Sequence, residues 1–179
     1  SGEAYGMNFV YSGNFLAGAE VSNNNLTRMF MGLNPFDFNW RLEPGEDFTA
    51  PEVVMVYSDC GIGGMSRIYH NLYRNHLCRG KYKLAERPVL INNWEATYFD
   101  FNEEKILNIA KKAKEIGVEL MVLDDGWFGE RNNDDCSLGD WFVNFKKLPD
   151  GISGLSEKIE QMGMKFGLWC EPEMVSPVS

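Results

Sequence analysis

Carboxylates and tryptophans follow directly after three short apolar runs in the second half of the sequence. The polar groups are Asn92–Glu95, then Asp124–Trp127, and then Trp169–Glu173. Sugar hydroxyls donate to carboxylates in charge-assisted hydrogen bonds, which are about twice as strong as neutral ones. Tryptophan covers the apolar C–H face of a sugar ring and excludes water from it. This combination of residue types predicts a carbohydrate site.

Asp124 and Asp125 are poorly placed to act as the two catalytic carboxylates of a glycosidase. Retaining enzymes hold those groups about 5–5.5 Å apart across the bond that breaks, whereas consecutive strand residues point to opposite faces. Binding two neighbouring hydroxyls of one sugar is an easier task for such a pair. A simple Asx turn remains an alternative for the Asp-Asp-Gly tripeptide taken alone. Trp94 and Trp169, on neighbouring strand ends, favour the sugar site.

A metal site is the competing interpretation of the acidic residues, because carboxylates are hard oxygen ligands. Residues 133–140 lack the alternating ligands and the final glutamate of a calcium loop. No histidine follows His76, which disfavours zinc and a Ser-His-Asp triad. Cys170 has no cationic neighbour in sequence and is expected to be a small buried thiol. We therefore expect neither a metal nor a cofactor.

The elements that must position these residues alternate between strand and helix. Strands are expected at 89–91, 120–123 and 166–169, and helices from Glu103 to Gly117 and from Gly154 to Gly163. This alternation predicts parallel strands with right-handed crossovers. The glycine-rich phosphate turn of a dinucleotide fold is missing after Ile91. Polar groups at the carboxyl ends of the strands favour a (β/α)8 TIM barrel, of which residues 87–179 would supply the first three β/α units.

The first part of the chain is expected to be antiparallel. Short β-prone runs at 9–11, 15–16, 27–31 and 53–57 are separated by turn-rich clusters. They predict the later part of an antiparallel β-sandwich at 1–61. An amphipathic helix after Gly63 and a polar connector form a linking segment at 62–86, which places the barrel at 87–179.

Composition excludes several classes of function. The chain has 179 residues with 17 Lys+Arg against 26 Asp+Glu, a net charge of −9. This acidic balance, without a basic block, argues against nucleic-acid and anionic-membrane partners, and no apolar run is long enough to span a membrane. The four cysteines are widely scattered, which fits reduced thiols. A cytoplasmic location is expected.

Several long motifs resemble glycoside hydrolase family 36 α-galactosidases (melibiases) of bacteria. The segments that resemble the first barrel strands and loops are Asn92–Phe101, Leu123–Gly129, Leu138–Trp141 and Leu168–Val175. Those that resemble the end of the family's N-terminal β-supersandwich domain and its link to the barrel are Tyr11–Phe15, Asn34–Phe38 and Leu77–Gly80. The order of these motifs identifies the chain as an internal part of such an enzyme.

The resemblance implies retaining hydrolysis of terminal α-1,6-linked galactose in oligosaccharides such as melibiose and raffinose. Asp124 and Asp125 would accept hydrogen bonds from the galactose O4 and O6 hydroxyls, and Trp94 and Trp169 would wall the sugar pocket. The catalytic nucleophile and acid/base are aspartates on later strands, so no catalytic residue is assigned here and the chain alone is expected to be inactive. Cys170 departs from the phenylalanine that relatives often carry.

Three alternatives to this activity stay open. Two keep the fold: hydrolysis of α-N-acetylgalactosaminides and raffinose-type galactosyl transfer to sucrose. The third is a non-catalytic galactose-binding module. The resemblance also implies a homotetramer for the full-length protein.

Overall fold

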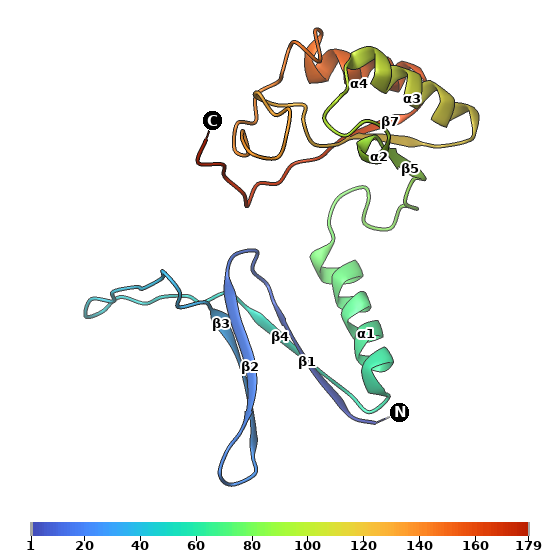
Figure 1. Ribbon diagram of the computed structural model, residues 1–179. Helices are drawn as coiled ribbons and strands as arrows, with labels where there is room; N and C mark the ends of the chain where they lie inside the picture. The colour runs from blue at the N-terminus through green and yellow to red at the C-terminus, as the bar shows by residue number, and fades with distance from the viewer. Residues whose placement is uncertain (1, 179) are drawn as a thin grey trace. The chain divides into compact units, whose positions relative to one another are not determined.

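The computed structural model describes residues 2–178. The chain divides into two compact units, residues 1–85 and residues 86–179. Figure 1 shows antiparallel strands and one long helix in the first unit, and alternating strands and helices in the second. No helix in the described range is long and apolar enough to cross a membrane. The candidate site residues all belong to the second unit.

Four strands of the first unit form two antiparallel pairs, so the antiparallel pairing expected for this part is confirmed. Strand β1 (Ala4–Phe9) pairs with β4 (Val53–Ser58), and β2 (Phe15–Val21) pairs with β3 (Thr27–Leu33). A helix, α1 (Gly61–Leu72), follows β4 and continues into a π-helical turn, η1 (Tyr73–Leu77). The division of this part into a sandwich end and a linking segment stays a prediction.

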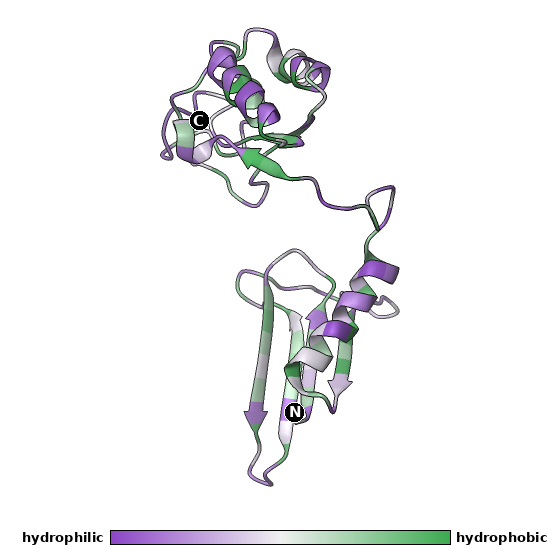
Figure 2. Cartoon of the chain, turned by 90° about the vertical axis from the view of Figure 1, so that its right-hand side faces the viewer, coloured by the Kyte–Doolittle hydropathy of each residue, from purple (hydrophilic) through white to green (hydrophobic). Residues whose placement is uncertain are grey.

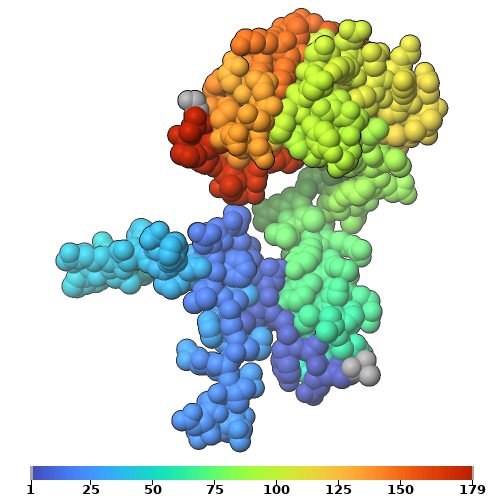
Figure 3. All heavy atoms as spheres, in the orientation of Figure 1, coloured from blue at the N-terminus to red at the C-terminus, as the bar shows by residue number. Residues whose placement is uncertain are grey.

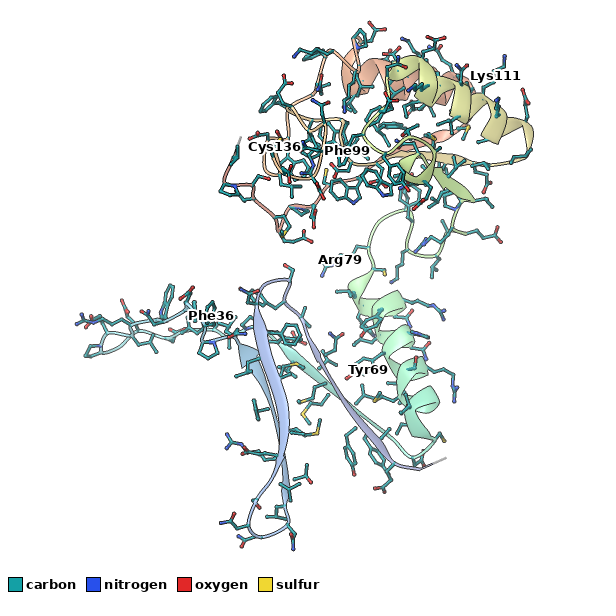
Figure 4. All side chains as sticks on the ribbon, viewed as in Figure 1. Phe36, Tyr69, Arg79, Phe99, Lys111 and Cys136 are labelled. Atoms are coloured by element: carbon teal, nitrogen blue, oxygen red, sulfur yellow. The ribbon has the colours of Figure 1, made fainter. Side chains whose placement is uncertain are left out.

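Helix α1 packs against the β1–β4 pair. The Tyr69 hydroxyl donates to the carbonyl of Val54 at 3.1 Å, and the hydroxyl of Tyr73, the first residue of η1, donates to Asn8 Oδ1 at 2.6 Å. Figure 4 shows Tyr69 on the side of α1 that faces the strands. Hydrophilic and hydrophobic residues alternate along α1 (Figure 2), as expected for a helix that buries one face.

The predicted bounds of the first strand were wrong. The strand was expected at 9–11, but β1 ends at Phe9. Gly6, in its middle, lies under α1, and a Cβ there would come within 2.6 Å of Met65 Sδ. A glycine inside a strand can mark such a close approach of a neighbouring element rather than a turn.

The first unit exposes many large apolar side chains. Phe36 is 77% exposed and Trp40 is 61% exposed. Both lie in the segment between β3 and β4, which projects as a narrow arm from the strands of this unit (Figure 3). Tyr69 is the only large apolar side chain of the described part of this unit that is buried. The first unit therefore has very little core of its own.

The second unit is a parallel β/α arrangement. Its strands β5 (Leu90–Asn92), β6 (Leu120–Leu123) and β7 (Lys165–Leu168) form one sheet in the order β5-β6-β7, and both pairs are parallel. The crossovers contain α3 (Glu103–Glu115) and α4 (Gly151–Gln161). The predicted parallel pairing is thereby confirmed. All three strands end at the same edge of the sheet.

Local sequence signals explain where α3 begins and ends. The Asn102 side chain accepts a hydrogen bond from the backbone N–H of Lys105 at 2.9 Å, which caps the helix. Gly117 follows the helix with a φ of +92°, a conformation that favours glycine. Helix α4 begins at Gly151, three residues before the expected Gly154. A four-residue helix, α2 (Trp94–Thr97), was not anticipated from the sequence.

The core of the second unit lies between the sheet and its two helices. Ile106 of α3, Leu155 and Ile159 of α4, and Met121 and Leu123 of β6 are fully buried. These side chains are spaced as one helix face and one strand face require. This packing fixes β6, and with it the position of the two aspartates that follow.

Candidate functional site

The first aspartate of the candidate site, Asp124, is held by the neighbouring strand end. Asn92, the last residue of β5, donates from Nδ2 to Asp124 Oδ2. Its Oδ1 accepts the backbone N–H of Trp94 at 2.6 Å. Asp124 Oδ1 accepts the backbone N–H of Asp125 at 2.7 Å. Asn92 therefore links the Asp124 carboxylate to the backbone of Trp94.

Asn93 makes a second link between the same two strand ends. Its side chain is completely buried. Its Oδ1 accepts the backbone N–H of Asp124 at 2.8 Å, and its Nδ2 donates to Thr97 Oγ1 at 2.9 Å. Because a buried amide is stable only when its polar atoms are paired, this arrangement fixes the start of α2 against the turn after β6.

Asp125 has a different environment from Asp124. It is 7% exposed and lies beside Arg131, which is 4% exposed. Arg131 Nε lies 3.0 Å from Asp125 Oδ1, and Arg131 Nη2 lies 2.9 Å from Asp125 Oδ2. Such two-point pairing fixes the plane of the carboxylate. Asp125 is thus oriented by a buried cation.

Arg131 is itself fixed on two further sides. Its Nη1 donates to the carbonyl of Cys136 at 2.7 Å, and its guanidinium lies 5.5 Å from the centre of the Phe99 ring. Figure 4 labels Phe99 and Cys136, which both lie in the loop region of the second unit. Hydrogen bonding to Asp125 raises the pKa of Arg131 above its usual value. Arg131 therefore remains a cation.

The two aspartates differ in their remaining capacity to accept hydrogen bonds. A carboxylate offers about four lone-pair positions. Asp124 is half-buried, and each of its oxygens accepts one protein donor. Both oxygens of the more buried Asp125 face Arg131. Asp124 is therefore the more accessible acceptor for a ligand hydroxyl.

The two tryptophans occupy the outer strand ends. The Trp94 ring packs edge-on against the Phe99 ring, with 5.0 Å between their centres. The backbone N–H of Trp169 donates to the carbonyl of Leu123 at 2.9 Å, and its own carbonyl accepts from Trp127 Nε1 at 2.9 Å. The structure thus places Trp94, Asp124, Asp125 and Trp169 at the carboxyl ends of three adjacent parallel strands. Their roles toward a ligand stay predictions.

Gly126 closes the turn that carries the aspartates, with a φ of +96°. A Cβ there would lie 3.0 Å from the Phe99 ring and 3.3 Å from the carbonyl of Arg131. We expect Gly126→Ala to destabilise the whole protein by about 2–4 kcal/mol, because backbone strain and overpacking add. Urea unfolding measures the effect.

Gly117→Ala is the matched control for this substitution. Gly117 has a similar φ of +92°, but a Cβ added there would meet no atom within 4 Å. Its replacement should cost only the strain, about 1–2 kcal/mol. Equal losses for the two variants would show that the contacts around Gly126 have no role in stability.

Within residues 2–178, no three His, Cys, Asp or Glu side chains gather where they could hold a metal ion. Cys60, Cys78, Cys136 and Cys170 are all free thiols. Cys170 is exposed, so its expected burial is wrong for the residues present. It lies two residues after Leu168, the last residue of β7, outside the sheet.

Sequence reasoning missed Arg131 and the side-chain links made by Asn92 and Asn93. The asparagines were visible as polar residues after a strand, but Asp124, which both of them contact, lies about thirty residues away in the sequence. For Arg131, the only signal was a cation six residues after Asp125 in a segment with Gly126 and Gly129. That signal becomes specific only when the path of the loop is known.

Two family models match the sequence. The model described as Melibiase matches residues 47–179, and the model described as Glycosyl hydrolase family 36 N-terminal domain matches residues 1–43. The alpha-galactosidase AgaA of Geobacillus stearothermophilus is 65% identical over 99% of this chain, which corresponds to 24% of its own length. Alpha-galactosidase Mel36A of Lactobacillus acidophilus is 50% identical over 98% of this chain and 24% of its length.

Solved structures show the same similarity. The crystal structure of AgaA superposes with a TM-score of 0.88 at 65% identity, covering 99% of this chain and 25% of AgaA. A variant of AgaA with a TM-score of 0.88 was crystallised in complex with raffinose, and another in complex with stachyose. The chain spans about a quarter of the length of these relatives.

Proposed function

The chain belongs to the melibiase family of glycoside hydrolases, and we propose that the whole protein is a retaining α-galactosidase. Its substrates are oligosaccharides with a terminal α-1,6-linked galactose, such as melibiose and raffinose. Residues 1–179 supply part of the galactose subsite, and the catalytic aspartates lie in other parts of the protein. Support comes from relatives named alpha-galactosidases, one of them in complex with raffinose.

The proposed architecture follows from the same relatives. The first unit is the end of an antiparallel β-supersandwich, and β5, α3, β6, α4 and β7 belong to the first three β/α units of a (β/α)8 barrel. The sparsely buried first unit and the two outer strands β5 and β7 are consistent with further protein packed on them. Active sites of such barrels lie at the carboxyl ends of the strands, where the candidate residues are found.

One observation carries the proposal: a partly exposed carboxylate is pinned at the end of β6 by a side chain from the neighbouring strand end. A fixed acceptor can distinguish the axial O4 of galactose from the equatorial O4 of glucose. When the wrong epimer binds, the polar groups built for the hydroxyl are left unpaired. Asp124 and Asp125 bind the O4 and O6 hydroxyls, and Trp94 and Trp169 cover the sugar ring.

The test is hydrolysis by the whole protein of nitrophenyl α-glycosides that differ only in the sugar. We expect kcat/KM for the α-galactoside to exceed that for the α-glucoside by about 100-fold or more, because discrimination rests on a hydrogen-bonded hydroxyl. The first product observed by NMR should be α-galactose, because a retaining mechanism preserves the anomeric configuration.

Other outcomes would replace this proposal by one of its alternatives. A preference for the α-N-acetylgalactosaminide would indicate the related hydrolase, and transfer to sucrose in place of hydrolysis would indicate a galactosyltransferase. Galactose binding in calorimetry without any turnover would indicate a non-catalytic module. Equal rates for galactoside and glucoside would remove the selective site.

We further propose that the whole protein is a cytoplasmic homotetramer. The four free cysteines fit a reducing compartment, and the tetramer rests on the resemblance to the family. Light scattering of the whole protein gives its mass in solution, and a mass of one subunit would contradict the tetramer.

A further inference from the structure

Lys147 forms a three-way hydrogen-bonded junction in the second unit. Its Nζ donates to the backbone carbonyls of Phe99 at 2.9 Å, Gly126 at 3.0 Å and Arg131 at 3.1 Å. A lysine ammonium carries three donors. All three are therefore used on loop backbone rather than on a carboxylate or on solvent.

The three carbonyls belong to the loops that carry the candidate site. Phe99 lies in the loop after α2 and packs its ring against that of Trp94, the first residue of α2. Gly126 follows Asp125 directly, and Arg131 is the cation that orients Asp125. One ammonium group thus joins the loop of Trp94 to both sides of the turn that contains the aspartates.

The backbone of Lys147 is also held in place by hydrogen bonds. The Lys147 carbonyl accepts the N–H of Glu103 at the start of α3 at 2.9 Å, and its own N–H donates to the Asn144 carbonyl at 3.1 Å. Asn144 is buried, and its Nδ2 donates to the Gly129 carbonyl at 2.9 Å. The ammonium therefore projects from a fixed backbone, so it can impose a position on the loops around it.

The surroundings of the ammonium make this junction electrostatically strong. Its Nζ lies 4.8 Å from the centre of the Phe101 ring, and Phe101 is buried. Partial burial lowers the pKa of Lys147, and the charges of Asp125, Asp100 and Glu130 oppose that shift. Hydrogen bonds from a partly desolvated cation to carbonyl oxygens are stronger than those in water.

We propose that Lys147 is a positioning residue of the galactose subsite, which sets the distance between Trp94 and the Asp124–Asp125 turn. This inference rests on the proposed function. Lys147 does not touch the sugar. It acts through the Phe99 loop and through the Gly126 and Arg131 carbonyls, which place the tryptophan and the carboxylates relative to each other.

The experiment uses the whole protein with Lys147→Met, which keeps the length of the side chain but removes the ammonium, and with Lys147→Arg, which keeps the charge. Lys146→Met is the matched control, because Lys146 is exposed and pairs only at the surface with Glu130. We expect kcat/KM for a nitrophenyl α-galactoside to fall about 30-fold or more in Lys147→Met, since small misplacements of binding groups cost up to about 100-fold. The control should stay within about threefold.

A second substrate separates positioning from a general loss of structure. A 6-deoxygalactoside lacks the O6 hydroxyl, so a misplaced carboxylate weakens the binding of this substrate less. We expect Lys147→Met to lower kcat/KM for this substrate at least about fivefold less than for the galactoside. Equal losses for both substrates would overturn the inference, as would a Lys147→Met loss below threefold. If Lys147→Met does not fold, Lys147→Arg takes its place with the same two substrates, because a planar guanidinium cannot reach the three carbonyls in the same way.

The wild-type protein separates this inference from the proposed function. Absence of galactoside hydrolysis by wild type would contradict the proposed function alone. The inference then depends on the crystal structure of the same Lys147 variant. A shift between the Phe99 loop and the Asp124–Asp125 turn would support it, and loops that superpose on those of wild type would overturn it whatever the activity.

Discussion

Asp124→Asn in the whole protein is expected to lower kcat/KM for an α-galactoside by about 100-fold or more. Asp124 Oδ2 accepts from Asn92 Nδ2, and its Oδ1 accepts the N–H of Asp125. An asparagine has only one acceptor oxygen, so its amide nitrogen must face one of these two donors. The substitution therefore disturbs the turn as well as removing the charge that a sugar hydroxyl would bind.

The size of this effect follows from the energetics of hydrogen bonds to charged groups. Their net value is about 1.5–3 kcal/mol, and each 1.36 kcal/mol corresponds to a factor of ten in rate. Loss of one such bond together with a misplaced neighbour accounts for about two orders of magnitude. Steady-state kinetics with a nitrophenyl α-galactoside measures it.

Asp150→Asn is the matched control, because its side chain is 59% exposed at the start of α4 and pairs with Lys158. It should change kcat/KM by less than about twofold, as expected for a surface ion pair. If Asp124→Asn lowered kcat/KM less than about threefold, which corresponds to about 0.7 kcal/mol, Asp124 would have no role in substrate binding. A rise in KM with an unchanged kcat would indicate that Asp124 binds the ground state and the transition state equally well.

The regular elements of the second unit could be predicted because their signals are periodic. The apolar face of α3, its Asn102 cap and its closing Gly117 together determine one helix. The alternation of strand and helix then limits the sheet to parallel pairing. Since all parallel strands end at one edge, the proximity of Trp94, Asp124 and Trp169 could be anticipated from the sequence.

The internal contacts of the site could not be predicted, because they depend on loops without a period. Arg131 reaches Asp125 only after the chain has turned at Gly126 and Gly129, which both have positive φ. Lys147 lies some twenty residues after Gly126 and meets its carbonyl through the packing of the whole loop. Likewise, Gly6 pairs with Val56 of β4, and the close approach of α1 that explains a glycine at this position is not visible in the local sequence. The partners of these side chains are determined by the tertiary structure and not by the local sequence.

In the first unit, the sequence indicated the strands but not the bounds of the first one. Ser58 is the only buried residue in its four strands, so local β propensity rather than a buried face indicated them. The predicted strand at 53–57 agrees with β4 to within one residue. The strand at 9–11 failed because the alternating pattern of Ala4–Phe9 is interrupted by glycine.

Arg131→Met is expected to destabilise the second unit by about 3–5 kcal/mol, the cost of removing one partner from a buried ion pair. The side chains of Arg131 and Asp125 are only 4% and 10% exposed. Without the guanidinium, the Asp125 carboxylate would remain buried without its cation, and the carbonyl of Cys136 would lose its donor. Urea unfolding of the whole protein, followed by the fluorescence of its tryptophans, measures the change.

Lys146→Met provides the reference for this loss, because the Lys146–Glu130 pair has side chains that are 80% and 70% exposed. Its removal should cost less than about 1 kcal/mol. Adding Asp125→Asn to Arg131→Met removes the unpaired charge, so the double variant should be more stable than Arg131→Met alone. If the double variant were instead less stable than the wild type by the sum of the two single losses, the two side chains would be energetically independent. Asp125 would then be oriented by the turn and not by Arg131.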